Sequence, residues 1–398
     1  MIDMQEIDGI EEWLIGQALS TVSLPAIFDE MCQRLRQCHV PVDRATVGWT
    51  TLHPLVEAEM VYWSAQKGAE HHRYGHHEED EEEWLQSPMR AVLYNNEGML
   101  RRKLQEANQT LDFPLLRNLA SEGYSDYIVI STPFELPALQ EMQGRTGVLV
   151  SWSTRSEGGF SDDALHAISY LQKRFALAAR ATLQAEITRT IADTYLGQIA
   201  SRKVLTGQIR HGDGETIKAV IFYCDMRNST AIAESLGPSD YISWLNTYFT
   251  ATAGAILKHG GEILDFIGDA VLAVFPIGDT GLKEAAVKAI EATDDIRQNL
   301  ADLNHSGKHH TQLRAGMALS VGDVMFGNIG VPDRLTFSVI GQTVHAAARM
   351  EALTKTTATD ILITKDIADI VGSRASLVGN FGLSGFSIEQ PLFTVSEP

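Results

Sequence analysis

The stretch "GGEILDFIGDAVLAVF", Gly260–Phe275, decides the fold expected for the C-terminal half of the chain. Two apolar runs flank the dipeptide Gly268-Asp269, which is typical of a tight turn between paired strands. The stretch therefore predicts a β-hairpin. Asp265 and Asp269 lie four positions apart in it, and a carboxylate in apolar surroundings is costly unless it has a partner. These two residues are the first candidates for a functional site.

A second segment, "AVIFYCDMRNST" at Ala219–Thr230, predicts a strand that ends at Asp225 and is followed by a helix. This arrangement suits a metal-bound phosphate, because the carboxylate can bind the cation and the first amides of the helix can bind the anion. A third segment, "LRAGMALSVGDVMFGNIG" at Leu313–Gly330, predicts another hairpin, with its turn at Gly322-Asp323.

The fourth segment, "RLTFSVIGQTVHAAARMEAL" at Arg334–Leu353, predicts a strand followed by a helix. His345 and Arg349 are four residues apart and therefore share one face of this helix. Two carboxylates at strand ends, together with arginines from another element, are the groups that phosphoryl chemistry with two metal ions uses.

These blocks, in this order and spacing, resemble the class III nucleotidyl cyclase domain of adenylate and guanylate cyclases. The matching motifs are "IGDAVLAVF", "GDVMFGNIG" and "SVIGQTVHAAARME", the last in place of the family's Gly-x-x-Val-Asn-x-Ala-x-Arg. The resemblance covers about residues 215–396, and the catalytic domain is expected at residues 215–398. It implies an α+β, ferredoxin-like catalytic domain, in which an antiparallel sheet has flanking helices.

The resemblance also implies a role for each matching residue. Asp225, Asp269 and the carbonyl of Met226 would bind two divalent cations, Mg²⁺ or Mn²⁺. Arg349 would stabilise charge on the α-phosphoryl group, and Arg314 would hold the terminal phosphates. In this family one chain holds the metals and the other supplies the base-reading residues and the catalytic arginine, so a homodimer is expected. The predicted substrate-binding residues also include Met226, Arg227, Asn228, Ser229 and Thr230.

The sequence departs from the family's pattern at four positions. Asp265 replaces the lysine that reads the base, and Ser338 replaces its usual Asp or Thr partner. His345, the second predicted catalytic residue, replaces an asparagine. Ser384, in "GLSGFSI", replaces a lysine that holds phosphate.

The first two departures bear on the choice of base. Adenine N1 is an acceptor, so an ionised carboxylate at Asp265 cannot bond to it, although it can accept from the N6 amine. Guanine offers two adjacent donors to a carboxylate, and its O6 can accept from the Ser338 hydroxyl. Guanylate cyclases of the family resemble this arrangement, with Glu and Cys at the two positions.

Three functions follow from these residues. The family favours conversion of ATP to 3′,5′-cyclic AMP and pyrophosphate, the local chemistry of Asp265 suits GTP, and the missing lysine and asparagine suit a nucleotide-binding signalling module without turnover. Taken alone, the residues also have structural interpretations: the aspartates as turn caps, Arg314 as a surface ion pair and His345 as a packed side chain.

The N-terminal half has the order helix, hairpin, helices, hairpin and long helix, which resembles a GAF-type sensory domain over residues 1–180. Helical periodicity over Ile7–Leu35 breaks near Pro25. Alternating segments at 45–51 and 59–64, and at 127–132 and 147–154, predict two strand pairs. Residues 181–214 would form a helical linker, and the front domain would regulate catalysis by binding an unidentified small molecule or partner.

The tract "HHRYGHHEEDEEEW" raises the question of a metal site at His71, His72, His76 and His77. The alternative, a solvated charged loop between two elements, is favoured because nothing in the pattern supplies groups to orient the histidines.

Composition restricts the partners. A net charge of −19 argues against nucleic-acid binding, which depends on clustered basic residues. The sequence contains 3 cysteines without metal-ligand spacing, an acidic start unlike a signal peptide and no run long enough to span a membrane. We expect a cytoplasmic protein that does not associate with membranes.

Overall fold

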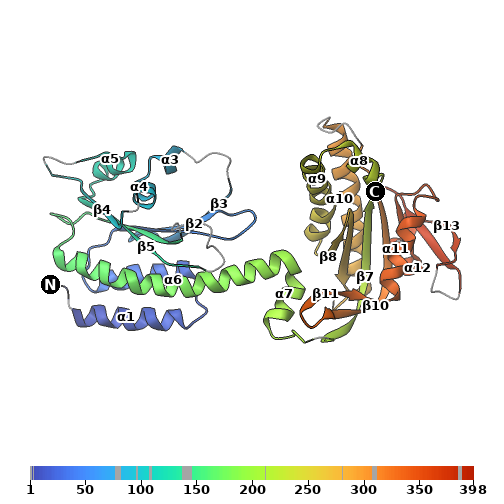
Figure 1. The fold of residues 1–398 in the computed structure, drawn as a ribbon, viewed down its shortest axis with the longest axis horizontal. Helices are drawn as coiled ribbons and strands as arrows, with labels where there is room; N and C mark the ends of the chain where they lie inside the picture. The colour runs from blue at the N-terminus through green and yellow to red at the C-terminus, as the bar shows by residue number, and fades with distance from the viewer. Residues whose placement is uncertain are drawn as a thin grey trace. The chain divides into compact units, whose positions relative to one another are not determined.

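The computed structural model describes residues 2, 4–76, 82–95, 97–106, 110–136, 146–210, 212–279, 281–306, 312–383 and 388–398. The chain divides into two compact units, Met1–Ile191 and Ala192–Pro398 (Figure 1). Within the described ranges, no helix is both long and apolar enough to cross a membrane.

The first unit contains a six-stranded antiparallel sheet in the order β3-β2-β1-β6-β5-β4. Both predicted strand pairs are confirmed, as β1–β2 and β5–β6. The histidines at 71 and 72 lie on β3, so the interpretation of that part of the tract as a loop was wrong. The strands are β1 (Arg44–Thr50), β2 (Ala58–Ser64), β3 (Gly68–Tyr74), β4 (Met99–Lys103), β5 (Asp126–Pro133) and β6 (Gly147–Thr154).

Helices cover both faces of this sheet (Figure 1). One face shares a core with α1, α2 and α6, whereas α4 and α5 pack on the other. Pro25 lies in the first turn of α2, where its missing N–H costs nothing, which explains the predicted break. The helices are α1 (Met4–Ala18), α2 (Leu24–Gln37), α3 (Glu82–Leu85), α4 (Pro88–Tyr94), α5 (Pro114–Ser121) and α6 (Asp162–Leu196).

The second unit contains an eight-stranded sheet in the order β13-β14-β12-β10-β7-β9-β8, with β11 paired to β10. Only the β10–β12 pair is parallel. The strands are β7 (Gly214–Met226), β8 (Glu262–Ile267), β9 (Ala270–Pro276), β10 (Ala315–Val331), β11 (Arg334–Ile340), β12 (Ile361–Thr364), β13 (Ala375–Phe381) and β14 (Gln390–Val395).

Two helical layers enclose the central strands of this sheet. The helices α9, α10 and α12 share one core with them, and α7 and α11 pack on the opposite face. The helices are α7 (Gln198–Leu205), α8 (Ser229–Ser235), α9 (Pro238–Lys258), α10 (Gly281–His305), α11 (Gln342–Leu353) and α12 (Lys365–Val371), with a short 3₁₀ turn at Gly372–Arg374.

The predicted hairpin turn at Gly322-Asp323 was wrong. The strand β10 runs through these residues without interruption for 17 residues and pairs with β7 along most of its length. A Cβ at position 322 would collide with Thr343 at the start of α11. The glycine is therefore needed for helix-to-strand packing, and the chain turns only between β10 and β11.

The start of β8 is bonded to α7. Glu262 is 9% exposed, and its Oε1 accepts a hydrogen bond from the Ile199 backbone amide at 2.6 Å. This amide belongs to the first turn of α7, where backbone donors lack partners within the helix. Burial raises the pKa of Glu262, while the amides of Ile199 and Ala200 act in the opposite direction.

Candidate active site

Asp225 and Asp269 meet at one edge of the second sheet. Asp225 is the penultimate residue of β7, and Asp269 follows Gly268 in the turn between β8 and β9. Gly268 has a φ of 65°, which only glycine adopts without strain. The register pairs Cys224 with Val271, so the two carboxylates emerge from neighbouring strands at the same level.

The electrostatics of this pair fit a cation. Burial raises the pKa of Asp225, and the negative charge of Asp269 raises it further. Lys355 opposes this effect, with its Nζ 3.5 Å from Asp225 Oδ2. Asp269 Oδ2 is buried without a hydrogen-bond partner in the part of the chain described here. Two adjacent carboxylates with an unsatisfied buried oxygen are the donor set that Mg²⁺ or Mn²⁺ prefers.

The residues after Asp225 differ in what they offer a ligand. The side chain of Met226 is 1% exposed in the core, so only its backbone can face a bound group. Asn228 directly precedes α8 and has a φ of 61°. Asn228 and Thr230 are exposed, whereas Ser229 is half-buried.

Arg227 is engaged within the chain. Its Nη1 lies 3.4 Å from Glu351 Oε1 on α11, and its Nη2 donates to the Thr354 hydroxyl. A Cβ at Gly316 of β10 would collide with both members of this ion pair. The guanidinium predicted to contact substrate therefore connects the end of β7 to α11, and a role in substrate binding remains a prediction.

Arg314 lies at the same edge of the sheet as the aspartates. Its carbonyl accepts a hydrogen bond from the Arg227 amide at 2.9 Å, which places it directly beside the end of β7. The exposed guanidinium bonds to Gln312 Oε1 at 2.7 Å through Nη2. This single hydrogen bond, to a residue two positions earlier in the chain, leaves most of the guanidinium N–H donors available to an anion.

Asp265 and Ser338 lie on strands that pack against each other, β8 and β11. A bulge after Ile263 leaves Leu264 out of register, and such a bulge redirects the side chains beyond it. Leu264 packs in the same cluster as Phe337, next to Ser338. Asp265 is exposed, and its carboxylate has no hydrogen-bond or ion-pair partner among the described residues.

On α11, His345 is exposed and Arg349 half-buried. The helix buries Ala346, Ala347 and Met350 against the sheet, so the two predicted catalytic residues lie away from this packed face. Ser384 lies outside the described residues.

Comparison with known proteins identifies the C-terminal part. A family model for the adenylate and guanylate cyclase catalytic domain matches residues 214–385. These residues belong to that family. The sequence-based identification of a class III cyclase domain is thereby confirmed, whereas the likeness of the first unit to a GAF-type domain remains a prediction.

Curated relatives also contain this cyclase domain. An adenylate cyclase of Dictyostelium discoideum is 32% identical over 162 residues, which are 41% of this chain and 8% of that protein. Adenylate cyclases of Anabaena cylindrica and Rhizobium meliloti are each 30% identical, over 45% and 43% of this chain and 35% and 46% of their own lengths. The chain thus spans less than half the length of these relatives.

Two solved structures resemble the cyclase domain. The adenylyl cyclase CyaB from P. aeruginosa is 25% identical, with a TM-score of 0.42 over 46% of this chain and 96% of that chain. The guanylyl cyclase Cya2 is 27% identical, with a TM-score of 0.41 over 46% of this chain and 94% of that chain.

Two residues near the cyclase carboxylates were missed by sequence reasoning. Glu351 is 3% exposed, and burial raises its pKa, with a further contribution from the charge of Asp225. The sequence contains one indication of this residue, because Glu351 occupies a position of the α11 pattern that faces the apolar core. Lys355 follows that helix, and nothing in its local sequence distinguishes it from an ordinary surface lysine.

The histidine tract has local partners instead of a cluster of ligands. His71 Nε2 lies 2.9 Å from Glu59 Oε2, and the ring of His72 contacts Tyr62 edge-on. His76 Nε2 lies 2.9 Å from the His53 carbonyl. The described residues contain no group of three or more His, Cys, Asp or Glu side chains able to hold a metal ion. His77 lies outside them.

Proposed function

We propose that the protein converts ATP to 3′,5′-cyclic AMP and pyrophosphate at a site formed between two copies of the chain. The observation that carries this proposal is the pairing of Asp225 with Asp269, whose Oδ2 is buried and unpartnered. Arg314 at the same sheet edge supports it, because a guanidinium suits the terminal phosphates.

In the proposed reaction the ribose 3′-oxygen bonds to the α-phosphorus, the bond to pyrophosphate breaks and the 3′-hydroxyl loses its proton. Divalent cations held by Asp225 and Asp269 would supply acidification of that hydroxyl and charge neutralisation on the leaving group. Arg314 binds the terminal phosphates and orients the triphosphate. Arg349 stabilises negative charge as it develops on the α-phosphoryl oxygens.

The geometry of α11 supports a site composed from two chains. Glu351 faces Arg227 and the carboxylates of its own chain, whereas Arg349 precedes it by two residues and so points to another side of the helix. In addition, Asp225 pairs with Gly316 near the start of β10, but Ser338 pairs with Gly327 near its end. The two ends of one β10 would thus serve two different nucleotides.

A dimer of this kind contains two equivalent sites. Each would take Asp225, Asp269 and Arg314 from one copy, and the base-reading residues with Arg349 from the other. Exposed apolar side chains beside the base-reading position, Phe266 at 49% and Ile267 at 50%, are suited to burial between copies.

GTP is the second candidate substrate, and Asp265 is the observation that favours it. Its exposed carboxylate has no partner within the described residues, so it is available to accept from the two adjacent donors of guanine. The hydroxyl of Ser338 can donate to O6.

Regulation by the first unit is part of the proposal, and α7 is the element that supports it. Gly197, with a φ of 81°, separates α6 from α7, and α7 is bonded to β8 through Glu262. Alanine at Gly197 would strain this junction, because its Cβ would lie 3.1 Å from Glu262 Oε1 and 3.2 Å from the Ile263 carbonyl at the start of β8. We expect Gly197→Ala to change cyclase activity; unchanged activity would contradict control through this junction.

The catalytic proposal is tested with the full-length protein, Mn²⁺ and either ATP or GTP, with products separated by chromatography. We expect a 3′,5′-cyclic nucleotide from wild type and none from Asp225→Ala or Asp269→Ala. Lys288→Ala, which removes an exposed lysine paired with Glu284 on α10, is a matched surface control. If wild type yields no cyclic product from either nucleotide, the proposal of cyclase activity is wrong.

A further inference from the structure

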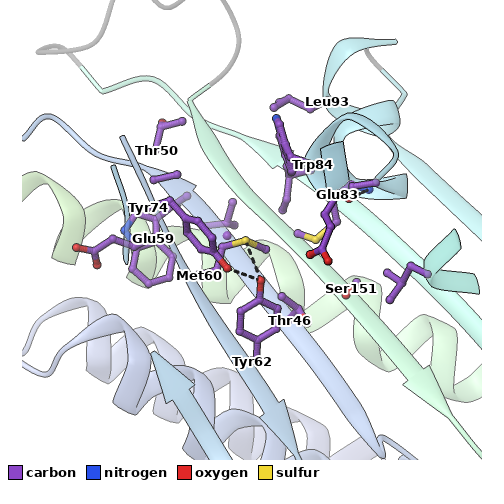
Figure 2. A pocket seen from close by; sticks show the side chains of 18 of the residues that line it. Thr46, Thr50, Glu59, Met60, Tyr62, Tyr74, Glu83, Trp84, Leu93 and Ser151 are labelled. Carbon is purple, nitrogen blue, oxygen red and sulfur yellow. Dashed lines mark hydrogen bonds between the residues drawn. The ribbon is translucent and has the colours of Figure 1, made fainter. Parts of the chain in front are cut away.

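The first unit encloses a cavity of about 590 Å³ between its sheet and the helices α3, α4 and α5 (Figure 2). The strands β1, β2 and β6 form its floor. This volume is in the range of sites that bind small organic molecules. The cavity lies wholly within residues 44–151 and is separate from the carboxylate pair of the cyclase domain.

The floor of the cavity contains an unsatisfied polar group. Thr46 is 2% exposed, and its Oγ1 has no hydrogen-bond partner among the described residues. Ser151 lies opposite Thr46 in the β1–β6 register and also lines the cavity. Leaving a buried hydroxyl unpaired is costly, so this side chain is suited to bond a ligand.

A cation lies beside this hydroxyl. Arg44 precedes Thr46 by two residues on β1, so both side chains lie on the cavity face of the sheet. Arg44 is half-buried, and its guanidinium has no hydrogen-bond or ion-pair partner among the described residues. Burial raises the pKa of Tyr62 and Tyr127, and the nearby positive charge of Arg44 partly offsets that effect. A half-buried guanidinium without a partner favours an anion.

The walls above this charge are aromatic and thioether surfaces. The hydroxyls of Tyr62 and Tyr74 bond to each other at 2.8 Å, and Tyr62 also lies 3.4 Å from Met60 Sδ, as Figure 2 shows. Trp84 comes from α3 on the opposite side. Flat π-surfaces on two sides, with the phenol groups already paired, favour a planar apolar body over a sugar-like one.

Negative charge limits how much anionic character a ligand can have. Glu57, Glu82 and Glu83 line the cavity, and Glu83 is close enough to raise the pKa of Tyr62 slightly after burial and the Tyr74 bond. Glu59 also lines the cavity, but its carboxylate is already paired with His71 and Arg73. The Arg44 guanidinium offers a place for one negative charge, whereas the carboxylates in the lining repel a polyanion such as a nucleoside triphosphate.

We propose that this cavity binds a planar aromatic molecule with one acidic group, which Arg44 and the Thr46 hydroxyl hold on the floor while the ring system lies between Tyr62 and Trp84. The site is independent of the cyclase reaction. It provides the first unit with a defined class of ligand, an aromatic monoanion.

Two fluorescent probes with related ring systems test this proposal in the full-length protein. The first is 8-anilinonaphthalene-1-sulfonate, and the second is N-phenyl-1-naphthylamine, which lacks the sulfonate. We expect wild type to bind both. Arg44→Gln should weaken binding of the sulfonate about tenfold or more, the worth of a charge-assisted hydrogen bond, and leave the neutral probe within about twofold.

A second variant tests the location. Gly48 lines the floor at an ordinary φ, and a Cβ there would meet Met60 Cγ at 3.5 Å, so Gly48→Leu adds volume inside the cavity. It should abolish saturable binding of both probes. Arg73→Gln, on the other face of the sheet, is the matched control and should change neither.

Thermal melting followed by circular dichroism shows whether each variant is folded, independently of probe binding. A loss of binding can therefore be distinguished from a loss of folding. Equal weakening of both probes by Arg44→Gln would overturn the anionic assignment. Retention of both probes by folded Gly48→Leu, or no saturable binding to wild type, would overturn the site. None of these results depends on cyclase activity.

Discussion

Arg349 and Glu351 are two residues apart on α11 and leave the helix about 160° apart, as 3.6 residues per turn require. Glu351 is directed to Arg227 and to the carboxylates of its own chain. Arg349 is consequently directed elsewhere, and this relationship supports our proposal that the site is divided between two copies of the chain.

Complementation between inactive variants follows from that division. Asp225→Ala and Arg349→Ala should each inactivate the homodimer, because each damages both of its sites. In a mixture, half of the dimers contain one copy of each, and one of their two sites has all its native residues. Equimolar coexpression should therefore restore about a quarter of wild-type activity.

The measurement is cyclic nucleotide production by the unfractionated equimolar mixture, in which the homodimers of each variant are still present. A matched control pairs Asp225→Ala with Asp269→Ala, which leaves every site damaged and should restore nothing. Equal activity in the two mixtures would mean that Arg349 does not act across the dimer.

Removing one carboxylate should stabilise the metal-free protein. Burial and the charge of Asp269 raise the pKa of Asp225, so its ionised form is disfavoured in the folded state. Asp225→Asn abolishes that charge, so we expect the free energy of unfolding of the metal-free protein to increase by about 1 kcal/mol. For a domain of this size, this increase corresponds to a rise of about 2–4 °C in Tm. The ion pair with Lys355 is lost, but that lysine is 53% exposed and contributes little.

Thermal melting with a chelator and then with Mn²⁺ checks this prediction. Wild type should gain stability from Mn²⁺, because a cation that binds only the folded state raises Tm. Asp225→Asn should start higher and gain less. A lower Tm for the variant in chelator would show that the carboxylate pair is not repulsive.

Base selection should respond to Asp265 and Ser338 together. Asp265→Lys supplies a donor for adenine N1, and Ser338→Asp supplies an acceptor for the N6 amine. The double variant should therefore shift the ratio of kcat/KM for ATP over GTP upward, by about tenfold or more for each well-formed hydrogen-bond pair. Both nucleotides must be measured because specificity is a difference between two affinities.

Single variants serve as controls, since Asp265→Lys alone leaves the new lysine without its acidic neighbour. An unchanged ratio in the double variant would mean that the carboxylate at 265 does not face the base.

The bond between Glu262 and α7 should make stability depend on pH. The pKa of Glu262 is raised by burial, so between its ordinary pKa and the raised value the unfolded state has released the proton and the folded state has not. Stability therefore falls as pH rises through that window. Glu262→Gln cannot ionise, so its free energy of unfolding should increase relative to wild type as pH rises from the ordinary glutamate pKa through the raised one.

Glu262→Ala is the companion variant. Like Glu262→Gln it cannot ionise, but it also loses the acceptor for the Ile199 amide, so it should be less stable than Glu262→Gln by about 1–2 kcal/mol at any pH, as with the loss of a helix cap. Urea unfolding of the two variants separates the charge from the hydrogen bond. A constant difference between Glu262→Gln and wild type would contradict the raised pKa.

The sequence predicted the parts of the site that local chemistry determines. The turn at Gly268-Asp269 and the strand ending near Asp225 depend on residues close to one another in the chain, and both are found in the structure. Gly322 resembled a turn residue, but the reason for a glycine there lies at Thr343.

The contacts between side chains from distant segments could not be predicted from the sequence either. Nothing near Arg227 indicates that Glu351 would bond to it, and nothing near Arg44 indicates that the strands around it would leave its guanidinium facing a cavity. Periodicity identifies elements, whereas the partner of a charged side chain depends on how those elements pack.

The hydrogen bond from Ile199 to Glu262 has a kinetic consequence. The strand β8 begins at Glu262, carries Asp265 in its middle and leads into the turn that holds Asp269. We therefore expect a displacement of α7 to act on the proposed base recognition and on the proposed metal binding at once. A signal that arrives through this helix should alter KM for the nucleotide and the Mn²⁺ concentration for half-maximal rate in parallel, even when the activity of the fully saturated enzyme is unchanged.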